Sequence, residues 1–350
     1  MVLNMPKDKR NALRFGIGEW YGKSFADMDD ATRLAYANFK ADKGARLKKT
    51  ERERLAALEI KGSSGILTAK EAARLAELRV KKANEVAGNK LCPFKGLNKD
   101  AICTKEGGVC SLRLYEKTDN GAVPIEGERG SLRALCPYRF HEQQKIFHWA
   151  GRVLLGDKNP GLVGEVGFLE SSESVDGVEG DDVGRIDMVL VKSGLPDGYP
   201  MQWAALEIQA VYFSGSEMGK EFKEIRRQNG TLTFPKEVRR PDYRSSGPKR
   251  LMPQLQIKVP TLRRWGKKMA VVVDRSFFNS MGRMEAVGDL SNSDIAWFLV
   301  DFEKTSKGDA FKLVAAEVVF TTLERAIEGL TGGSPVPLSE FEQRIAEKLN

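Results

Sequence analysis

The chain has 350 residues, of which 41% are hydrophobic and 30% are charged, and its formal net charge is +8. These values are typical of a water-soluble protein that buries a full core and carries one or two appendages. No apolar run approaches the roughly 18 residues of a membrane-spanning helix, and the N-terminus lacks the apolar stretch of a secretion signal. The composition therefore excludes a membrane protein and favours a cytoplasmic location.

Residues 11–90 have the character of helices. Two capping boxes, each a Thr followed three residues later by a Glu, predict helix starts. The boxes are Thr50 with Glu53 and Thr68 with Glu71. A glycine- and serine-rich linker between them predicts a helical hairpin of about 51–60 and 69–86. Its apolar positions are few, so we expect residues 1–90 to form an N-terminal helical arm.

The four cysteines fall close together in the next segment. They are Cys92, Cys103, Cys110 and Cys136. Such clustering in a cytosolic chain favours a metal site over disulfides. Four thiolates make a closed tetrahedral shell, which is typical of structural zinc or of an iron site. We expect residues 91–150 to form a four-cysteine metal-binding module; buried free thiols are the alternative.

Two histidines, His141 and His148, lie seven residues apart on a helix that the sequence predicts after Cys136. Two helical turns separate them, which is too far for both to bind one ion. We interpret them as packing or phosphate-contacting residues.

The rest of the chain predicts a mixed core over residues 151–333, followed by a C-terminal helix within 334–350 that Ser339 and Glu342 cap. Strands are expected near 163–169, 185–192, 202–212, 269–274, 295–302 and 311–320, with a helix near 251–266. The stretch 165–182 has seven acidic and no basic residues, so apart from Glu165 it predicts a solvated loop. The fold class is α/β (α+β), a mixed sheet flanked by helices.

Two of these strands carry acidic residues that point to chemistry. In a strand, residues i and i+2 share a face, so Glu207 and Gln209 project together, opposite Leu206 and Ile208. If this strand pairs with the one that carries Asp187, two carboxylates and an amide meet. Such a group suits Mg²⁺, which takes oxygen ligands and keeps several waters. The alternative is an ordinary half-buried hairpin with a polar face.

A basic block follows these strands. Residues 220–268 hold 15 Lys/Arg and 4 Asp/Glu, a local charge of +11. Aromatic side chains lie among the charges. The pattern favours a polyanionic partner over a merely solvated charged face.

Several motifs together resemble, in order, those of the NotI-type restriction endonucleases, a branch of the PD-(D/E)xK nucleases in which Gln replaces the usual Lys. They are Gly18-Glu-Trp-Tyr-Gly22, Leu91-Cys-Pro-Phe, Gly108-Val-Cys110, Leu135-Cys-Pro-Tyr138-Arg139, Gly164-Glu165-Val, Arg185-Ile-Asp187, Leu206-Glu-Ile-Gln209, Phe213-Ser-Gly-Ser and Ala296-Trp-Phe-Leu-Val. Residues 25–88 look like an insertion relative to that family pattern.

The resemblance implies an active site made of Glu165, Asp187, Glu207 and Gln209. Asp187 and Glu207, with the Ile208 carbonyl, would bind Mg²⁺, and Glu165 would position a second ion or its waters. The resemblance favours iron at Cys92, Cys103, Cys110 and Cys136, with zinc possible, and it suggests Arg139 as a DNA contact.

The function that follows is a Mg²⁺-dependent type II restriction endonuclease: a homodimer that cuts double-stranded DNA at a palindromic, GC-rich site, which a cognate DNA methyltransferase protects in the host. Two alternatives stay open. One is a nicking or repair endonuclease of the same fold, and the other is a non-catalytic, metal-stabilised DNA-binding protein.

Overall fold

The structure is a computed structural model that describes residues 12–40, 46–95, 101–119, 121–170, 182–215, 218–332 and 336–349. The chain divides into two compact units, each assembled from segments far apart in the sequence. Unit 1 comprises Met1–Gln143, Gly215–Arg240 and Phe302–Lys312, and unit 2 comprises Gln144–Ser214, Pro241–Asp301 and Leu313–Asn350. The four consecutive domains expected from the sequence stay a prediction.

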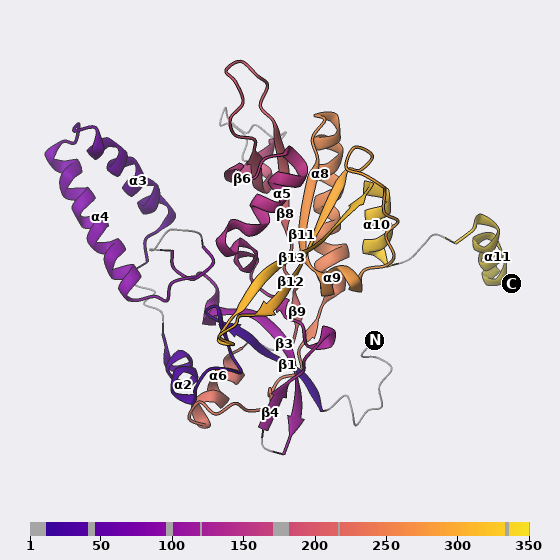
Figure 1. Ribbon diagram of the computed structural model, residues 1–350, viewed down its shortest axis with the longest axis horizontal. Coiled ribbons are helices and arrows are strands. Elements are labelled where there is room, and N and C mark those ends of the chain that lie inside the picture. The colour runs from indigo at the N-terminus through magenta and orange to yellow at the C-terminus, as the bar shows by residue number, and fades with distance from the viewer. Residues whose placement is uncertain are drawn as a thin grey trace. The chain divides into compact units, whose positions relative to one another are not determined.

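Unit 1 is built on an antiparallel sheet in the order β2-β1-β3-β4, with β5 paired to β3 (Figure 1). The strands are β1 (Leu13–Trp20), β2 (Lys23–Ser24), β3 (Val109–Thr118), β4 (Gly121–Pro124) and β5 (Arg133–Ala134). Phe15 and Ile17 are buried on β1. Between them Gly16 allows a close approach, since a Cβ there would lie 2.6 Å from the side chain of Pro235.

The helices of unit 1 include the predicted hairpin. They are α2 (Asp30–Asn38), α3 (Lys49–Ser63), α4 (Ala69–Ala87) and α6 (Gly219–Arg227), with 3₁₀ turns at Glu106–Gly108, Glu128–Gly130 and Pro137–Gln144. The predicted capping box of Thr68 and Glu71 opens α4. Five leucines form a small core of the hairpin's own: Leu47, Leu55, Leu58, Leu75 and Leu78.

Three expectations for this part of the chain are wrong. Residues 11–90 are not helical throughout, because Leu13–Trp20 pairs as a strand with β3. Helix α3 begins before the expected box: the Glu51 carboxylate accepts a hydrogen bond from the Lys48 N–H at 2.9 Å, so Thr50 already lies inside the helix. His141 and His148 do not share a helix, because α5 begins only at Lys145.

Unit 2 is built on a six-stranded mixed sheet in the order β13-β12-β11-β8-β7-β6 (Figure 1). The strands are β6 (Gly161–Glu170), β7 (Asp182–Val191), β8 (Trp203–Ile208), β11 (Met269–Asp274), β12 (Ile295–Lys304) and β13 (Phe311–Thr321). Strand β11 runs parallel to β8 and β12, whereas β7 is antiparallel to β6 and β8.

Helices cover both faces of this sheet. Helices α8 (Met252–Arg264) and α10 (Leu323–Thr331) bury leucines in one core with Trp297 of β12. Helix α5 (Lys145–Leu155) contacts β7 and β8, and its Trp149 packs edge-on against Phe298. Because Trp297 and Phe298 are neighbours on one strand, they face opposite sides. The predicted mixed sheet flanked by helices is confirmed.

The remaining elements are short or terminal. They are β9 (Phe213–Ser214), β10 (Arg240–Pro241), α7 (Tyr243–Ser246), a π-helical turn at Gly247–Leu251, α9 (Arg275–Ser280) and α11 (Leu338–Leu349). Helix α11 begins at Leu338, so Ser339 lies inside the helix and does not cap it. Across the described ranges, no helix is long and apolar enough to cross a membrane.

Two strand boundaries differ from the sequence prediction. Strand β6 continues to Glu170, into the stretch expected as an acidic loop, and most of that stretch, 171–181, lies outside the described residues. Strand β8 ends at Ile208 rather than at residue 212. Gln209 therefore stands just past the end of the strand.

Candidate active site

Strands β7 and β8 bring Asp187 and Glu207 together. Their antiparallel register pairs Met188 with Leu206, so Asp187 and Glu207 occupy the next cross-strand position and share a face of the sheet. The Asp187 Oδ2 accepts a hydrogen bond from the backbone N–H of Ile208 at 3.1 Å. This bond fixes the Asp187 carboxylate across the end of β8, beside the carboxylate of Glu207.

The Glu207 side chain is more enclosed than the strand pattern indicates. It lies on the face of the sheet that α8 covers, and it is only 3% exposed. Burial raises the pKa of the Glu207 carboxyl to about 7, the charge of Asp187 adds to the rise, and Lys258 opposes it. A buried carboxylate beside a second carboxylate is a place where a divalent cation relieves repulsion.

A lysine that the sequence gave no reason to single out completes this cluster. Lys258 of α8 donates from Nζ to Glu207 Oε2 at 2.5 Å and to Gln254 Oε1 at 2.8 Å. It is only 5% exposed. In the sequence, only the position of Lys258 between Leu255 and Val259, on the apolar stripe of a predicted helix, indicates that this lysine is buried.

Gln209 follows the end of β8, and Glu165 lies on β6 opposite Asp187 of β7. The Gln209 side chain donates from Nε2 to the Ala210 carbonyl at 2.7 Å, so its amide is turned along its own chain. Glu165 interrupts β6 with a left-handed backbone (φ 48°), and its exposed carboxylate lies 3.7 Å from Arg185. Arg185 shares its strand face with Asp187. Of the four residues expected from the sequence, Asp187 and Glu207 form the centre.

The four cysteines lie in unit 1 as free thiols, in two backbone pairs. Cys92 and Cys103 flank an isolated bridge between Leu91 and Ile102, and the Cys136 N–H donates to the Cys110 carbonyl at 3.2 Å. Burial and the charges of Cys92 and Cys136 raise the pKa of the Cys103 thiol. Among the described residues, however, no three His, Cys, Asp or Glu side chains are grouped closely enough to hold a metal ion.

Comparison with known families decides the identity of the chain. A family model described as restriction endonuclease NotI matches residues 76–313, about two thirds of the sequence.

The chain belongs to the NotI restriction endonuclease family.

Membership makes the protein a type II restriction enzyme, a site-specific deoxyribonuclease whose substrate is DNA. The matched range contains Asp187, Glu207 and all four cysteines, whereas β1 and most of the helical hairpin precede it. A search of curated proteins found no match to this chain.

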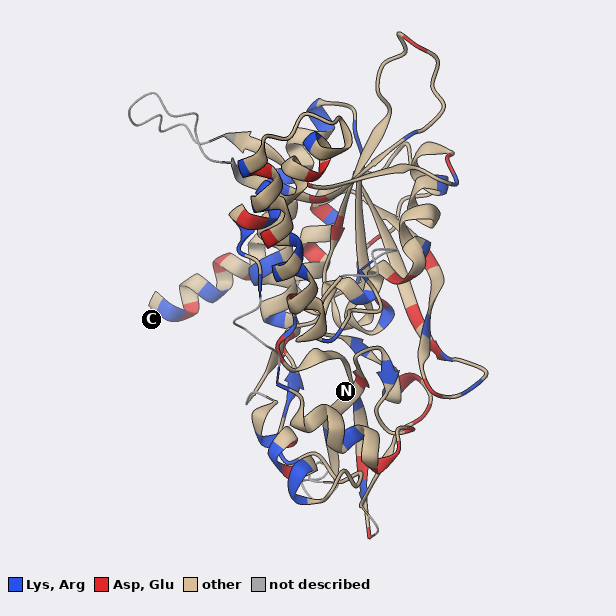
Figure 2. Cartoon of the chain, turned by 90° about the vertical axis from the view of Figure 1, so that its left-hand side faces the viewer, with Lys and Arg blue, Asp and Glu red and all other residues tan. Residues whose placement is uncertain are grey.

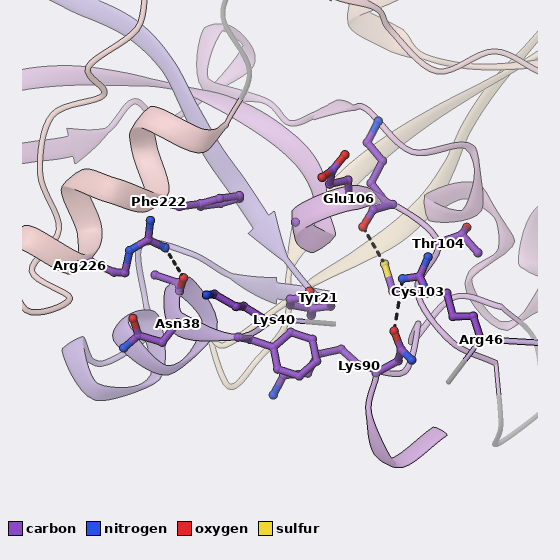
Figure 3. Close-up of a pocket in the computed structure, with 15 residues that line it drawn as sticks. Tyr21, Asn38, Lys40, Arg46, Lys90, Cys103, Thr104, Glu106, Phe222 and Arg226 are labelled. Atoms are coloured by element: carbon purple, nitrogen blue, oxygen red, sulfur yellow. Dashed lines mark hydrogen bonds between the residues drawn. The ribbon is translucent and has the colours of Figure 1, made fainter. Parts of the chain in front are cut away.

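Unit 1 contains a cavity with a mostly basic lining. Its volume is about 860 Å³. Figure 3 shows the side chains that line it. Among the described residues that line it, five are cations and Glu106 is the one carboxylate; the cations are Lys40, Arg46, Lys90, Lys105 and Arg226. Tyr21, Phe39 and Phe222 add aromatic rings. Arg226 donates to the Ala37 carbonyl at 2.5 Å, which fixes it at one wall of the cavity.

The basic block 220–268 is not a uniform DNA-facing surface. Figure 2 shows acidic positions interspersed with basic ones along the chain. Arg239 is buried against Glu221 at 2.7 Å, and Arg263 binds Asp294 at 2.5 Å. Part of the +11 charge thus stabilises the fold, which the count of charges alone did not indicate.

Arg139, suggested as a DNA contact in this family, is fully buried, so that prediction is wrong. Its Nε lies 2.8 Å from Glu19 Oε2, and its guanidinium sits over the rings of Phe94 and Phe302. An arginine with its charge paired and its plane covered by rings is a core residue.

Proposed function

We propose that this restriction enzyme hydrolyses phosphodiester bonds of double-stranded DNA in a Mg²⁺-dependent reaction centred on Asp187 and Glu207. The observation that carries the proposal is the placement of these two carboxylates at one cross-strand position, with Asp187 hydrogen-bonded to the Ile208 N–H. Two carboxylates with room for water ligands are the usual protein contribution to a Mg²⁺ site.

Each residue of the centre has a role in this proposal. Asp187, Glu207 and the Ile208 carbonyl would hold the ion, which supplies positive charge for the phosphate and an activated water. Gln209 would turn from Ala210 to orient the attacking water, since a neutral amide donates and accepts hydrogen bonds but carries no charge. Glu165 would position a second ion or its waters.

The four cysteines are proposed to hold a structural iron ion, and zinc fits the same all-sulfur donor set. Two features support this: the two backbone pairs and the family to which the chain belongs. A closed four-thiolate shell has no open position for substrate. The role proposed for it is therefore to brace the DNA-contacting surface of unit 1.

We also propose that the enzyme is a homodimer that cuts a palindromic, GC-rich site, and that a cognate methyltransferase protects the host copy of that site. A two-fold dimer on a palindrome lets each subunit cut one strand. The proposed division into an N-terminal arm that carries the helical hairpin besides β1 (1–90), a cysteine module (91–150), a nuclease core (151–333) and a C-terminal helix (334–350) assigns the chemistry to the third segment.

The test is digestion of a mapped DNA library with Mg²⁺, followed by sequencing of the fragment ends. We expect cleavage at one site, lost in Asp187→Asn and in Glu207→Gln, while both variants still bind DNA in Ca²⁺. Asp197→Asn is the matched control, because Asp197 is exposed in the loop between β7 and β8. Cleavage that persists in both variants would end the assignment, and persistent single-strand nicks would favour a nicking enzyme.

A further inference from the structure

We propose that Lys258 is a positioning residue of the active site, which supplies from α8 the positive charge that the neutral Gln209 cannot. The inference deepens the proposed function and rests on it. Its starting point is an unusual position for a lysine. Lys258 stands on the buried side of α8, between Leu255 and Val259, and it is only 5% exposed.

A lysine at such a position is costly for stability alone. Taking an ammonium and a carboxylate out of water costs several kcal/mol per ion, and apolar residues of similar volume often serve a fold equally well. A Leu or Met at residue 258 would extend the stripe that packs in the core with Trp297. The ion pair of Lys258 with Glu207 therefore calls for a reason beyond packing.

The hydrogen bonds of Lys258 place its ammonium next to the carboxylate pair of Glu207 and Asp187. Its Nζ bonds Glu207 Oε2 at 2.5 Å, and Gln254, one turn earlier on α8, holds the same ammonium at 2.8 Å. Glu207 in turn lies beside Asp187. The ammonium of Lys258 is thus held by α8 against the Glu207 carboxylate.

The charges of the site sum to a value that suits the substrate. When both carboxylates are ionised, as metal binding requires, Asp187 and Glu207 carry two negative charges and Lys258 one positive charge, so these three side chains sum to −1. With one divalent cation the site carries +1, the complement of a phosphodiester group with its single negative charge. Without Lys258 the loaded site would be neutral and would lose part of its attraction for the phosphate.

The same charges predict two opposite effects when Lys258 is replaced by Met. The carboxylates lose a competing cation, so a divalent ion binds more tightly. The metal-bound site loses its net positive charge, and Glu207 loses the hydrogen bond from Lys258 that orients its carboxylate, so turnover falls. A purely structural lysine would not produce tighter metal binding together with slower cleavage.

The experiment compares wild type with Lys258→Met and Lys258→Arg. Three quantities are measured for each protein. Calorimetry gives the affinity for Mn²⁺, and thermal melting reports folding. The rate of cleavage of the mapped site is measured in Mg²⁺ under single-turnover conditions. For Lys258→Met we expect a lower Kd for Mn²⁺ and cleavage slowed on the order of 100-fold. Lys258→Arg keeps the charge and should recover part of the rate. Arg325→Met is the matched control, since Arg325 is an exposed, ion-paired cation on α10.

Unchanged Mn²⁺ affinity and an unchanged rate in Lys258→Met would overturn the inference, and so would equal losses in the Met and Arg variants. If Lys258→Met does not fold, the Arg variant and Lys258→Gln carry the comparison. Failure of the proposed function has a different signature, because Asp187→Asn and Glu207→Gln would then still cleave DNA.

Discussion

Glu19 and Arg139 form an ion pair from which water is fully excluded, with both side chains 0% exposed and Nε 2.8 Å from Oε2. The pair joins β1 to the segment that follows Cys136. Ser111 of β3 donates a further hydrogen bond to Glu19 at 2.8 Å. Burial raises the pKa of the Glu19 carboxyl, and Arg139 is the main opposing influence. The pair therefore fixes the sheet of unit 1 to the cysteine segment.

Removal of one partner should destabilise the protein strongly. In Arg139→Met the buried Glu19 carboxylate loses its counter-charge, and breaking such a pair costs about 3–5 kcal/mol. Urea unfolding should show this loss, whereas the double variant Arg139→Met with Glu19→Gln should lose less. Arg325→Met, which removes an exposed pair, is the control and should change stability by less than about 1 kcal/mol. Equal losses in the single and double variants would refute this account of the pair.

Local sequence patterns predicted a helix or strand correctly where the residues of that element determine it by themselves. Thr68 and Glu71 predicted the start of α4, and the alternation around Leu206 predicted β8. Strand β1 was missed because its stability comes from pairing with β3, far along the chain, and because Gly16 and Gly18 mask its alternation. Those glycines are required by packing: a Cβ at Gly18 would lie 2.6 Å from Leu132.

The candidate site shows the same division. The spacing of Glu207 and Gln209 indicated chemistry, and the register that brings Asp187 beside Glu207 follows from the pairing of two neighbouring strands. Lys258 could not be found in this way, because its partner Glu207 lies 51 residues earlier. Arg139 was misassigned for a related reason: a sequence does not tell whether an arginine meets solvent or a buried carboxylate.

The basic cavity of unit 1 predicts a change in the salt dependence of DNA binding. Lys40 and Lys105 line it and are exposed, and each phosphate contact contributes about 0.9 to the slope of log K against log salt. Replacing both with Gln should weaken DNA binding for all sequences and lower the slope by about 2. Titration of labelled DNA in Ca²⁺ at several salt concentrations measures this. Lys348→Gln on α11 is the control, and a slope equal to that of wild type would remove the cavity from the DNA interface.

His141 predicts a loss of stability in acid. Burial lowers the pKa of its imidazole to about 4, and the nearby charge of Lys95 adds to the effect. Between the unfolded value of about 6.5 and the folded value, the unfolded chain binds more protons, so acidification favours unfolding. The contribution is complete above about pH 6.5, is lost as the pH falls toward 4, and amounts to no more than about 3.4 kcal/mol.

The measurement is urea unfolding of wild type and His141→Gln at pH 7 and pH 5. The variant should lose less stability than wild type between the two pH values, since Gln does not titrate. His148→Gln on α5 is the control and should follow wild type. Identical pH dependence in wild type and His141→Gln would contradict the prediction.

The cysteine pairs predict a bound metal with sulfur ligands. Purified protein should contain about one iron or zinc ion per chain, as a tetrahedral four-thiolate site requires. Cys103→Ser should release the ion and lower the melting temperature, because three thiolates leave the shell open and a metal bound only to the folded state stabilises it. Elemental analysis and thermal melting measure the two effects. Thr104→Ser, the neighbouring residue, is the matched control and should keep its metal. Wild-type protein without metal, or a Cys103→Ser variant that retains it, would leave the four cysteines as free thiols, of which Cys110 and Cys136 are buried.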